Sequence, residues 1–167
     1  MSEITDLLER FRRGAELVAM SMTGAAGAEV DFVPEPGKWS VRQIICHLAD
    51  AELVGAMRFR QIIAEERPAI QAFDEKAWAV KLDYGKRKPS HVIETFRRIR
   101  GENYELLKDC GEEIFARVGI HSERGPLKLI DLLNIYTNHA EKHALQLRGV
   151  RAAYKEAKAR AAVPDSR

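Results

Sequence analysis

Within the stretch Tyr136-Thr137-Asn138-His139-Ala140-Glu141-Lys142-His143-Ala144-Leu145-Gln146, two histidines stand four residues apart. On an α-helix, residues i and i+4 lie on the same face. That face also carries Leu132, Ile135, Tyr136, Gln146 and Val150, so we expect it to be buried. Two imidazoles at this spacing can bind one metal ion. For an isolated pair, two buried histidines satisfied by hydrogen bonds are the commoner outcome, so a metal site needs another ligand.

A third histidine lies in a second helical pattern. Ser40-Val41-Arg42-Gln43 fits a capping box, and Val41, Ile44, Leu48 and Ala51 form an apolar stripe that includes His47. Two facing helices of a bundle can bring His47 to His139 and His143. Three imidazoles around one ion leave a position for water or substrate, which is typical of a catalytic site. Nitrogen ligands suit zinc, nickel, iron or copper.

Four long helical patterns and no persuasive strand alternation predict an all-α four-helix bundle. The four helices are expected over residues 2–22, 40–66, 90–110 with Ser90 as N-cap, and 127–162. A short helix capped by Asp74 is expected within 73–78. The connections are 28–38, 68–89 and 111–126, and the long segment 68–89 is expected to shape a site or an edge. Residues 1–162 then form a single domain, and 163–167 a frayed tail.

Composition and charge exclude several classes of protein. A formal net charge of +2 is too small to indicate a nucleic-acid partner. Cys46 and Cys110 lack a C-x-x-C spacing, which disfavours a disulfide framework or a thiolate zinc site, and Cys46 reads as a small buried residue. No apolar run approaches the roughly 20 residues that span a bilayer, and no secretory signal is evident. The cytoplasm is therefore the expected location.

Two other metal chemistries do not fit the spacing. A zincin protease needs glutamate directly after the first histidine, whereas Glu141 lies two positions on, about 200° around the helix, and is expected to point away from the metal. A ferritin-like di-iron site needs Glu-x-x-His on two helices, and no glutamate here lies three residues before a histidine.

Several polar residues near these motifs keep two interpretations. Asp50, and Glu52 beside it, can orient a ligand or bind water, or can be solvated at the surface. His121 can line the mouth of a pocket or be an exposed loop residue. Tyr136 and Gln146 can contact a metal-bound ligand, although core packing is favoured for Tyr136. A basic cluster can attract an anionic substrate or thiol, although such a run is more often a solvated face; it comprises Lys81, Lys86, Arg87, Lys88, Arg97, Arg98 and Arg100. His91 is expected to be solvated.

Three segments resemble motifs of one family, the DinB superfamily. Residues 39–52 closely resemble its first-histidine motif, and residues 121–127 followed by 139–147 resemble its C-terminal motif. Residues 73–78 resemble a segment often found between them. The resemblance covers nearly the whole chain, and its specificity comes from the order and spacing of the motifs.

The resemblance implies an up-down-down-up four-helix bundle with His47, His139 and His143 as ligands of a divalent metal ion. Zinc or nickel is the first expectation, and iron or manganese the next. Members of this family are described as metal-dependent hydrolases or as enzymes that use a low-molecular-weight thiol, including bacillithiol or mycothiol S-transferases and a mycothiol-dependent maleylpyruvate isomerase. Relatives often carry an acidic residue directly after the first histidine of the pair, where this chain has Ala140.

The first functional hypothesis is therefore a metal-dependent hydrolase or thiol S-transferase that acts on a small molecule. A homodimer is expected at the level of the family, and a nucleic-acid or membrane partner is not. The alternative is a non-catalytic stress-response bundle that binds a metal or another ligand without turnover.

Overall fold

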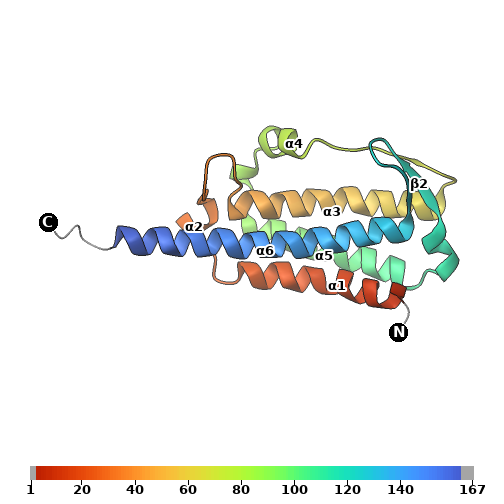
Figure 1. Ribbon diagram of the computed structural model, residues 1–167, viewed down its shortest axis with the longest axis horizontal. Helices are drawn as coiled ribbons and strands as arrows, with labels where there is room; N and C mark the ends of the chain where they lie inside the picture. Colours follow the sequence, from red (N-terminus) through yellow and green to blue (C-terminus); the bar gives the residue numbers. More distant parts are fainter. Residues whose placement is uncertain (1–2, 163–167) are drawn as a thin grey trace.

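Four long helices make up most of the protein, as the sequence predicts. The computed structural model describes residues 3–162, so the expected tail at 163–167 lies outside the described residues. The helices are α1 (Glu3–Met22), α3 (Val41–Ala64), α5 (Pro89–Lys108) and α6 (Leu129–Ala161) (Figure 1). Their bounds lie within about two residues of the predicted ones, which confirms the all-α bundle.

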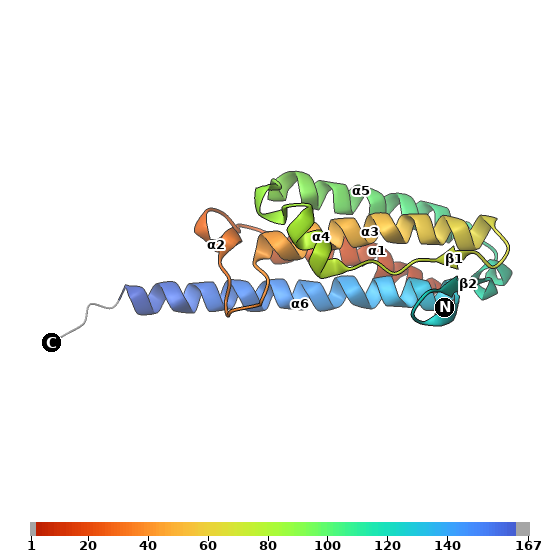
Figure 2. The same cartoon turned by 90° about the horizontal axis from the view of Figure 1, so that it is seen from above.

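The helices run in the up-down-down-up order. Helices α1 and α6 run in one direction, and α3 and α5 run in the other (Figures 1 and 2). Helix α1 contacts α5 and α6, and helix α3 also contacts both of them. Helix α3 therefore lies antiparallel beside α6, and the contact between these two helices joins His47 to the histidine pair.

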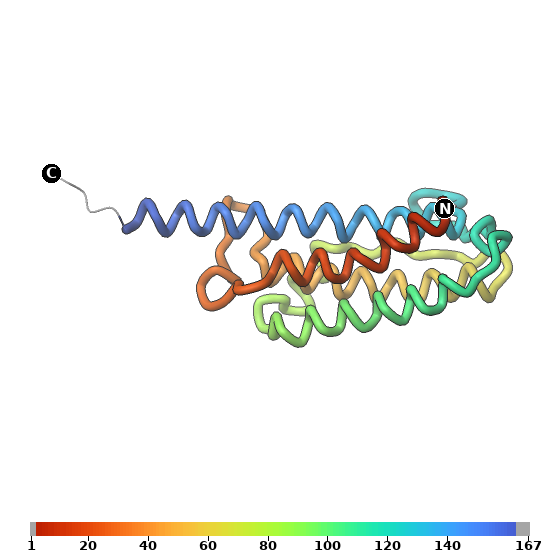
Figure 3. Tube along the Cα trace, turned by 90° about the horizontal axis from the view of Figure 1, so that it is seen from below, coloured from red at the N-terminus to blue at the C-terminus, as the bar shows by residue number. Residues whose placement is uncertain are grey.

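The parallel order of α3 and α5 requires a long return connection. Residues 65–88 run back along the bundle, visible in Figure 3 as the yellow-to-green part of the tube. They contain β1 (Ala69–Ile70), α4 (Glu75–Lys81) and a 3₁₀ turn, Tyr84–Lys86. This return path explains why the sequence shows an unusually long connection there, and it lays α4 beside α3.

Local sequence signals set where most helices begin. The predicted capping box is present, because Ser40 Oγ accepts a hydrogen bond from the Gln43 N–H and Gln43 Oε1 accepts one from the Ser40 N–H. Asp74 caps α4 as predicted. The prediction of Ser90 as the cap of α5 is wrong: Pro89 is already helical and Lys88 is the cap. Proline suits the first helical position because that residue needs no N–H donor.

The predicted loop at residues 111–126 contains more structure than expected. It holds a 3₁₀ helix, Glu112–Ala116, and the hairpin of β2 (Val118–His121) and β3 (Gly125–Lys128). Strand β1 pairs in parallel with β2, which completes a small sheet at one end of the bundle. The expected loop at 28–38 likewise begins with a helical turn, α2 (Ala28–Asp31). No helix among residues 3–162 combines the length and apolar character needed to cross a membrane.

A polar layer separates the two apolar clusters of the core. Arg100 and Glu52 are each 1% exposed and form an ion pair of 2.6 Å. Arg100 also donates to the carbonyl oxygens of Phe11 and Tyr136, so this one guanidinium connects all four long helices. The expectation that Arg100 belongs to a solvated basic face is therefore wrong. A buried charge is tolerated where it is paired and hydrogen-bonded, as it is here.

The close contact between α3 and α6 gives a first prediction. A Cβ atom added at Gly55 would lie 2.6 Å from the ring of Tyr136. We expect Gly55→Ala to lower the free energy of unfolding by about 1–2 kcal/mol, because overpacking outweighs the gain in helix propensity. Gly149→Ala is the matched control, since nothing lies within 4 Å of its added Cβ. It should stabilise the protein slightly in the same urea titration, and equal responses would contradict the prediction.

Candidate metal centre

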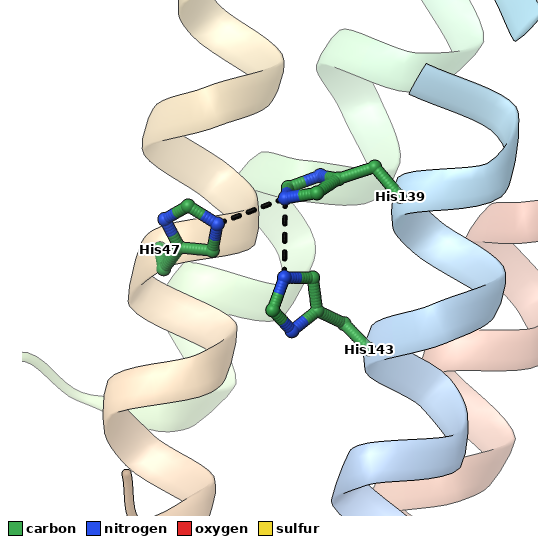
Figure 4. A group of neighbouring side chains, drawn as sticks. All are labelled: His47, His139 and His143. Atoms are coloured by element: carbon green, nitrogen blue, oxygen red, sulfur yellow. Dashed lines mark hydrogen bonds between the residues drawn. The ribbon is translucent and has the colours of Figure 1, made fainter. Parts of the chain in front are cut away.

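The three histidines singled out by the sequence converge on one point. His47 reaches across from α3, and His139 and His143 come from successive turns of α6 (Figure 4). His139 Nε2 lies 2.9 Å from His47 Nε2 and 3.1 Å from His143 Nε2. One ligand atom from each residue lies within 4.8 Å of the others, so the group can hold a metal ion.

The hydrogen bonds around the rings favour metal-ligating tautomers. His143 Nδ1 lies 2.7 Å from Gln146 Oε1, and because an amide oxygen only accepts, the proton belongs on Nδ1. The Nε2 lone pair of His143 is then free. His47 Nδ1 is buried and has no partner among the described residues. Convergent nitrogen lone pairs repel one another unless a proton or a cation lies between them. Three such nitrogen ligands therefore suit a divalent metal ion.

Burial keeps the three imidazoles in the neutral form that binds metal. It lowers the pKa of His47 to about 4 and that of His143 to about 4. Burial, followed by the positive charges that the other two rings would carry, lowers the pKa of His139 to about 2. Because a metal ion competes with protons for these nitrogens, a site of neutral imidazoles is ready to bind metal at pH 7.

The same shifts predict how the metal-free protein responds to acid. The pKa values are lowered in the folded chain, so below about pH 6.5 the unfolded chain binds more protons. The stability that neutral histidines contribute is present above that pH and is lost as pH falls toward 4. We expect each histidine to remove about 2 kcal/mol from the free energy of unfolding between pH 7 and pH 5, measured in urea with a chelator.

A variant with glutamine at His47, His139 and His143 should show a flatter pH profile. Replacing only the exposed His91 is the matched control for the loss of a histidine. An unchanged acid response in the triple variant would contradict the assignment to these rings.

A pocket opens beside the histidines. Its wall includes His139 and Tyr136 from α6, Arg58 from α3, Phe73 and Glu75 from the return connection, and His121 from β2. Glu75 Oε2 lies 4.0 Å from His47 Nε2. Of the segment 68–89, which is expected to shape a site or an edge, three residues line this pocket: Ala72, Phe73 and Glu75. The sequence interpretation missed Arg58, although it lies eleven residues after His47, which returns to about the same face of a helix.

The polar residues that kept two interpretations fall into two groups, those that form ion pairs within the fold and those that contact a histidine or line the pocket. Asp50 binds Arg87 and accepts a hydrogen bond from the Tyr84 hydroxyl, and Glu52 binds Arg100, so both carboxylates stabilise the fold. Gln146 contacts His143, whereas the Tyr136 hydroxyl accepts a hydrogen bond from Arg58. His121 is 6% exposed and lines the pocket.

The contacts of Glu141, Cys46 and Ala140 show how these three neighbours of the histidines are placed. Glu141 pairs with Arg10, as expected of a side chain that points away from the histidines. Cys46 is fully buried, and burial raises the pKa of its thiol to about 11, so it is a small core residue as predicted. Ala140 is also fully buried, and a Cβ added at Gly14 would lie 3.2 Å from its methyl group. Helix α1 therefore leaves no room at this position for the acidic side chain that relatives often carry.

Most of the basic cluster is a solvated face. Its exposed members are Lys81, Lys86, Lys88, Arg97 and Arg98. Lys86 pairs with Asp83 and Arg98 with Glu94, while Arg87 is half-buried against Asp50. The cluster does not line the pocket beside the histidines.

Known sequences similar to this chain include proteins named for a dependence on metal. A family model described as the DinB superfamily matches residues 10–147. "Putative metal-dependent hydrolase YfiT" of Bacillus subtilis is 31% identical over 117 residues, which cover 70% of this chain and 66% of YfiT. "Putative metal-dependent hydrolase OB0782" of Oceanobacillus iheyensis is 31% identical over 116 residues, which cover 69% of this chain and 66% of that protein. The matches thus span just under two thirds of the length of these relatives.

Solved structures show the same fold. YfiT from Bacillus subtilis, described as a probable metal-dependent hydrolase with an unusual four-helix bundle topology, superposes with a TM-score of 0.86 at 23% identity. The match covers 93% of this chain and 90% of that one. A mycothiol-dependent maleylpyruvate isomerase superposes with a TM-score of 0.71 at 14% identity, over 87% of this chain and 61% of that one. At these identities the likeness concerns the fold.

Proposed function

Because the chain belongs to the DinB superfamily, we propose that it is a metal-dependent enzyme that acts on a small molecule. The observation that carries this proposal is the convergence of three Nε2 atoms, from His47, His139 and His143, beside an open pocket. The reaction is hydrolysis or the transfer of a low-molecular-weight thiol. A cytoplasmic location and a homodimer stay predictions.

His47, His139 and His143 would hold the ion, with zinc or nickel first and iron or manganese as the other candidates. When bound, a divalent ion lowers the pKa of a water or thiol at its open position, which supplies a nucleophile near neutral pH. Gln146 holds the His143 ring in the tautomer that leaves Nε2 unprotonated. Such outer hydrogen bonds orient a ligand and raise its basicity.

Glu75 is the group best placed to move a proton. Its Oε2 lies 4.0 Å from His47 Nε2, and the carboxylate lines the same pocket as His139. Asp74 caps the first turn of α4 and thereby fixes the start of the helix that carries Glu75. A carboxylate at this position can accept the proton that water or a thiol releases as it becomes a nucleophile.

Metal content and turnover test the proposal together. The purified protein should contain near-stoichiometric metal by mass spectrometry, and a variant with alanine at His47, His139 and His143 should contain almost none. The loaded protein is then screened for hydrolysis of activated esters and amides and for transfer of mycothiol, bacillithiol or cysteine to an electrophile.

The variants separate the possible outcomes. Glu75→Gln should keep the metal and lose turnover, which distinguishes a proton acceptor from a ligand. Stoichiometric metal without turnover in either screen would favour the non-catalytic metal-binding bundle. Equal metal content in the parent protein and the triple variant would show that these three histidines do not bind the metal.

A further inference from the structure

One arginine in the described part of the chain lacks the partner that comparable arginines have. Six arginines among residues 3–162 are buried or half-buried, and five of them form ion pairs. These pairs are Arg42–Asp31, Arg87–Asp50, Arg100–Glu52, Arg117–Glu66 and Arg151–Glu29. Arg58 is the sixth, and it pairs with no carboxylate in the described part of the chain. A charge removed from water usually needs a counter-charge.

Neutral contacts hold the Arg58 side chain in the pocket wall. Its guanidinium donates to the Tyr136 hydroxyl at 3.2 Å and to the carbonyl oxygen of Gln71, and it lies 6.0 Å from the centre of the Phe73 ring. These hydrogen bonds use two of the five N–H donors that an arginine has. Arg58 Nε is buried without a partner in the described structure. The guanidinium is therefore held in place while some of its N–H donors are unpaired and its positive charge has no carboxylate partner.

A second donor with a fixed direction lies in the same pocket. His121 Nδ1 accepts hydrogen bonds from the backbone N–H groups of Glu123 at 3.2 Å and Arg124 at 3.3 Å. The imidazole proton therefore belongs on Nε2, which is a donor. Burial, and then the charges of Arg58 and Arg124, lower the pKa of His121 and keep the ring neutral. His121 Nε2 has no partner among residues 3–162.

The negative and positive side chains of the pocket lie at different places along it. The carboxylate of Glu75 lies near His47, at the histidine end. The Cα atom of Arg58 lies eleven residues further along α3, about 16 Å along the helix axis. Its guanidinium donates to the Tyr136 hydroxyl, and the Tyr136 ring centre lies 6.4 Å from that of His139. Leu132 and Ile135 supply apolar wall, and Glu123 and Arg124 are exposed side chains of opposite charge from the hairpin. The cationic end of the pocket thus lies apart from the end where the histidines converge.

We propose that Arg58 and His121 form an anion-binding subsite, so that the substrate carries a carboxylate or phosphate group at one end and its reacting bond at the histidine end. This inference rests on the proposed function for the reacting end only. The anionic group completes the ion pair that Arg58 lacks and accepts the hydrogen bond from His121 Nε2. The hydrocarbon part of the substrate packs on Leu132 and Ile135.

Small probes test this subsite in the full-length protein by NMR titration, with metal loaded and after treatment with a chelator. The probes are butanoate, its neutral analogue butanamide, and methyl phosphate. We expect butanoate or methyl phosphate to bind in both forms, and butanamide to bind at least about tenfold more weakly because it has no charge. The stronger of the two anions identifies the substrate group.

Substitutions assign the binding to the two residues. Arg58→Met should weaken binding of the anion by about 10–100-fold, the range for a hydrogen bond to a charged group. Arg60→Met is the matched control, because Arg60 is exposed on the same helix and contacts Asn103 instead of the pocket. It should bind the anion as the parent protein does.

His121 offers a pair of variants that keeps the proposal testable if Arg58→Met fails to fold. Asparagine can still accept from the two backbone N–H groups, as in an Asx turn, but it places no donor at the Nε2 position. Glutamine places an amide donor near that position. We expect His121→Asn to weaken binding about 3–10-fold, and His121→Gln to keep more of it.

Three results would overturn the subsite. These are equal binding of butanamide and butanoate, unchanged binding in both Arg58→Met and His121→Asn, and binding of the anions only when metal is loaded. If the parent protein binds no metal but the anions still bind, both to it and to the variant that lacks the three histidines, the subsite stands and the proposed metal enzyme is rejected. Metal binding without anion binding would reject the subsite and leave the proposed metal enzyme standing.

Discussion

His139→Ala should weaken metal binding by roughly 10²–10³-fold. Its Nε2 lies close to the Nε2 atoms of both other histidines, so it is central to the proposed ligand set. Structural zinc sites with four ligands bind with about 10–16 kcal/mol, or about 2.5–4 kcal/mol for each ligand. A loss of that size corresponds to the expected change in affinity. Competition with a chromogenic chelator at pH 7 measures it directly.

Two further variants make this a graded series. Gln146→Leu removes the hydrogen bond to His143 Nδ1 and should cost about 10–100-fold, as removal of such outer contacts typically does. His91→Ala makes the same chemical change as His139→Ala at an exposed position and should leave the affinity unchanged. If His139→Ala and His91→Ala bound metal equally well, the three-histidine site would have to be abandoned.

Sequence reasoning identified the histidines because two independent signals agreed. The spacing of His139 and His143 places them on one helical face, and His47 lies on the apolar stripe of another helix. Arg58 follows from the same periodicity and could have been found. Glu75 could not, because the return connection that brings it to His47 is set by the direction of α5. The tautomer of His121 depends on a turn of the hairpin and has no signal in the sequence.

The long helices were predictable for a similar reason, and the small sheet was not. Apolar residues repeat over five or more turns in each helix, whereas β2 and β3 have four residues each, too few for alternation to stand out. Arg100 was misread because Arg97 and Arg98 beside it are exposed and suggest a charged face. Its partner Glu52 lies 48 residues away, so only the packing of α3 against α5 reveals the pair.

Arg100→Met should lower the free energy of unfolding by about 3–5 kcal/mol. The change leaves the buried Glu52 carboxylate with Asn103 as its remaining hydrogen-bond donor among the described residues, at 3.2 Å. It also removes hydrogen bonds to the carbonyl oxygens of Phe11 and Tyr136, and the contact of the guanidinium with the Phe11 ring at 4.0 Å. Because single domains have about 5–15 kcal/mol in total, the loss should be obvious in a urea titration.

The reason for the loss can be tested by removing the charge that is left behind. In the double variant Arg100→Met with Glu52→Gln, the amide is neutral and its oxygen still accepts from Asn103, so much of the stability should return. Arg98→Met is the matched control: its pair with Glu94 is exposed, and we expect a change of about 0.5 kcal/mol or less. If the double variant were as unstable as the sum of its single variants, the cost would come from lost packing. If it recovers, the polar layer is held together by charge compensation. The Arg100 guanidinium, which pairs with Glu52 on α3 and donates to the Tyr136 carbonyl oxygen on α6, then also holds α3 against α6, where His47 meets His139.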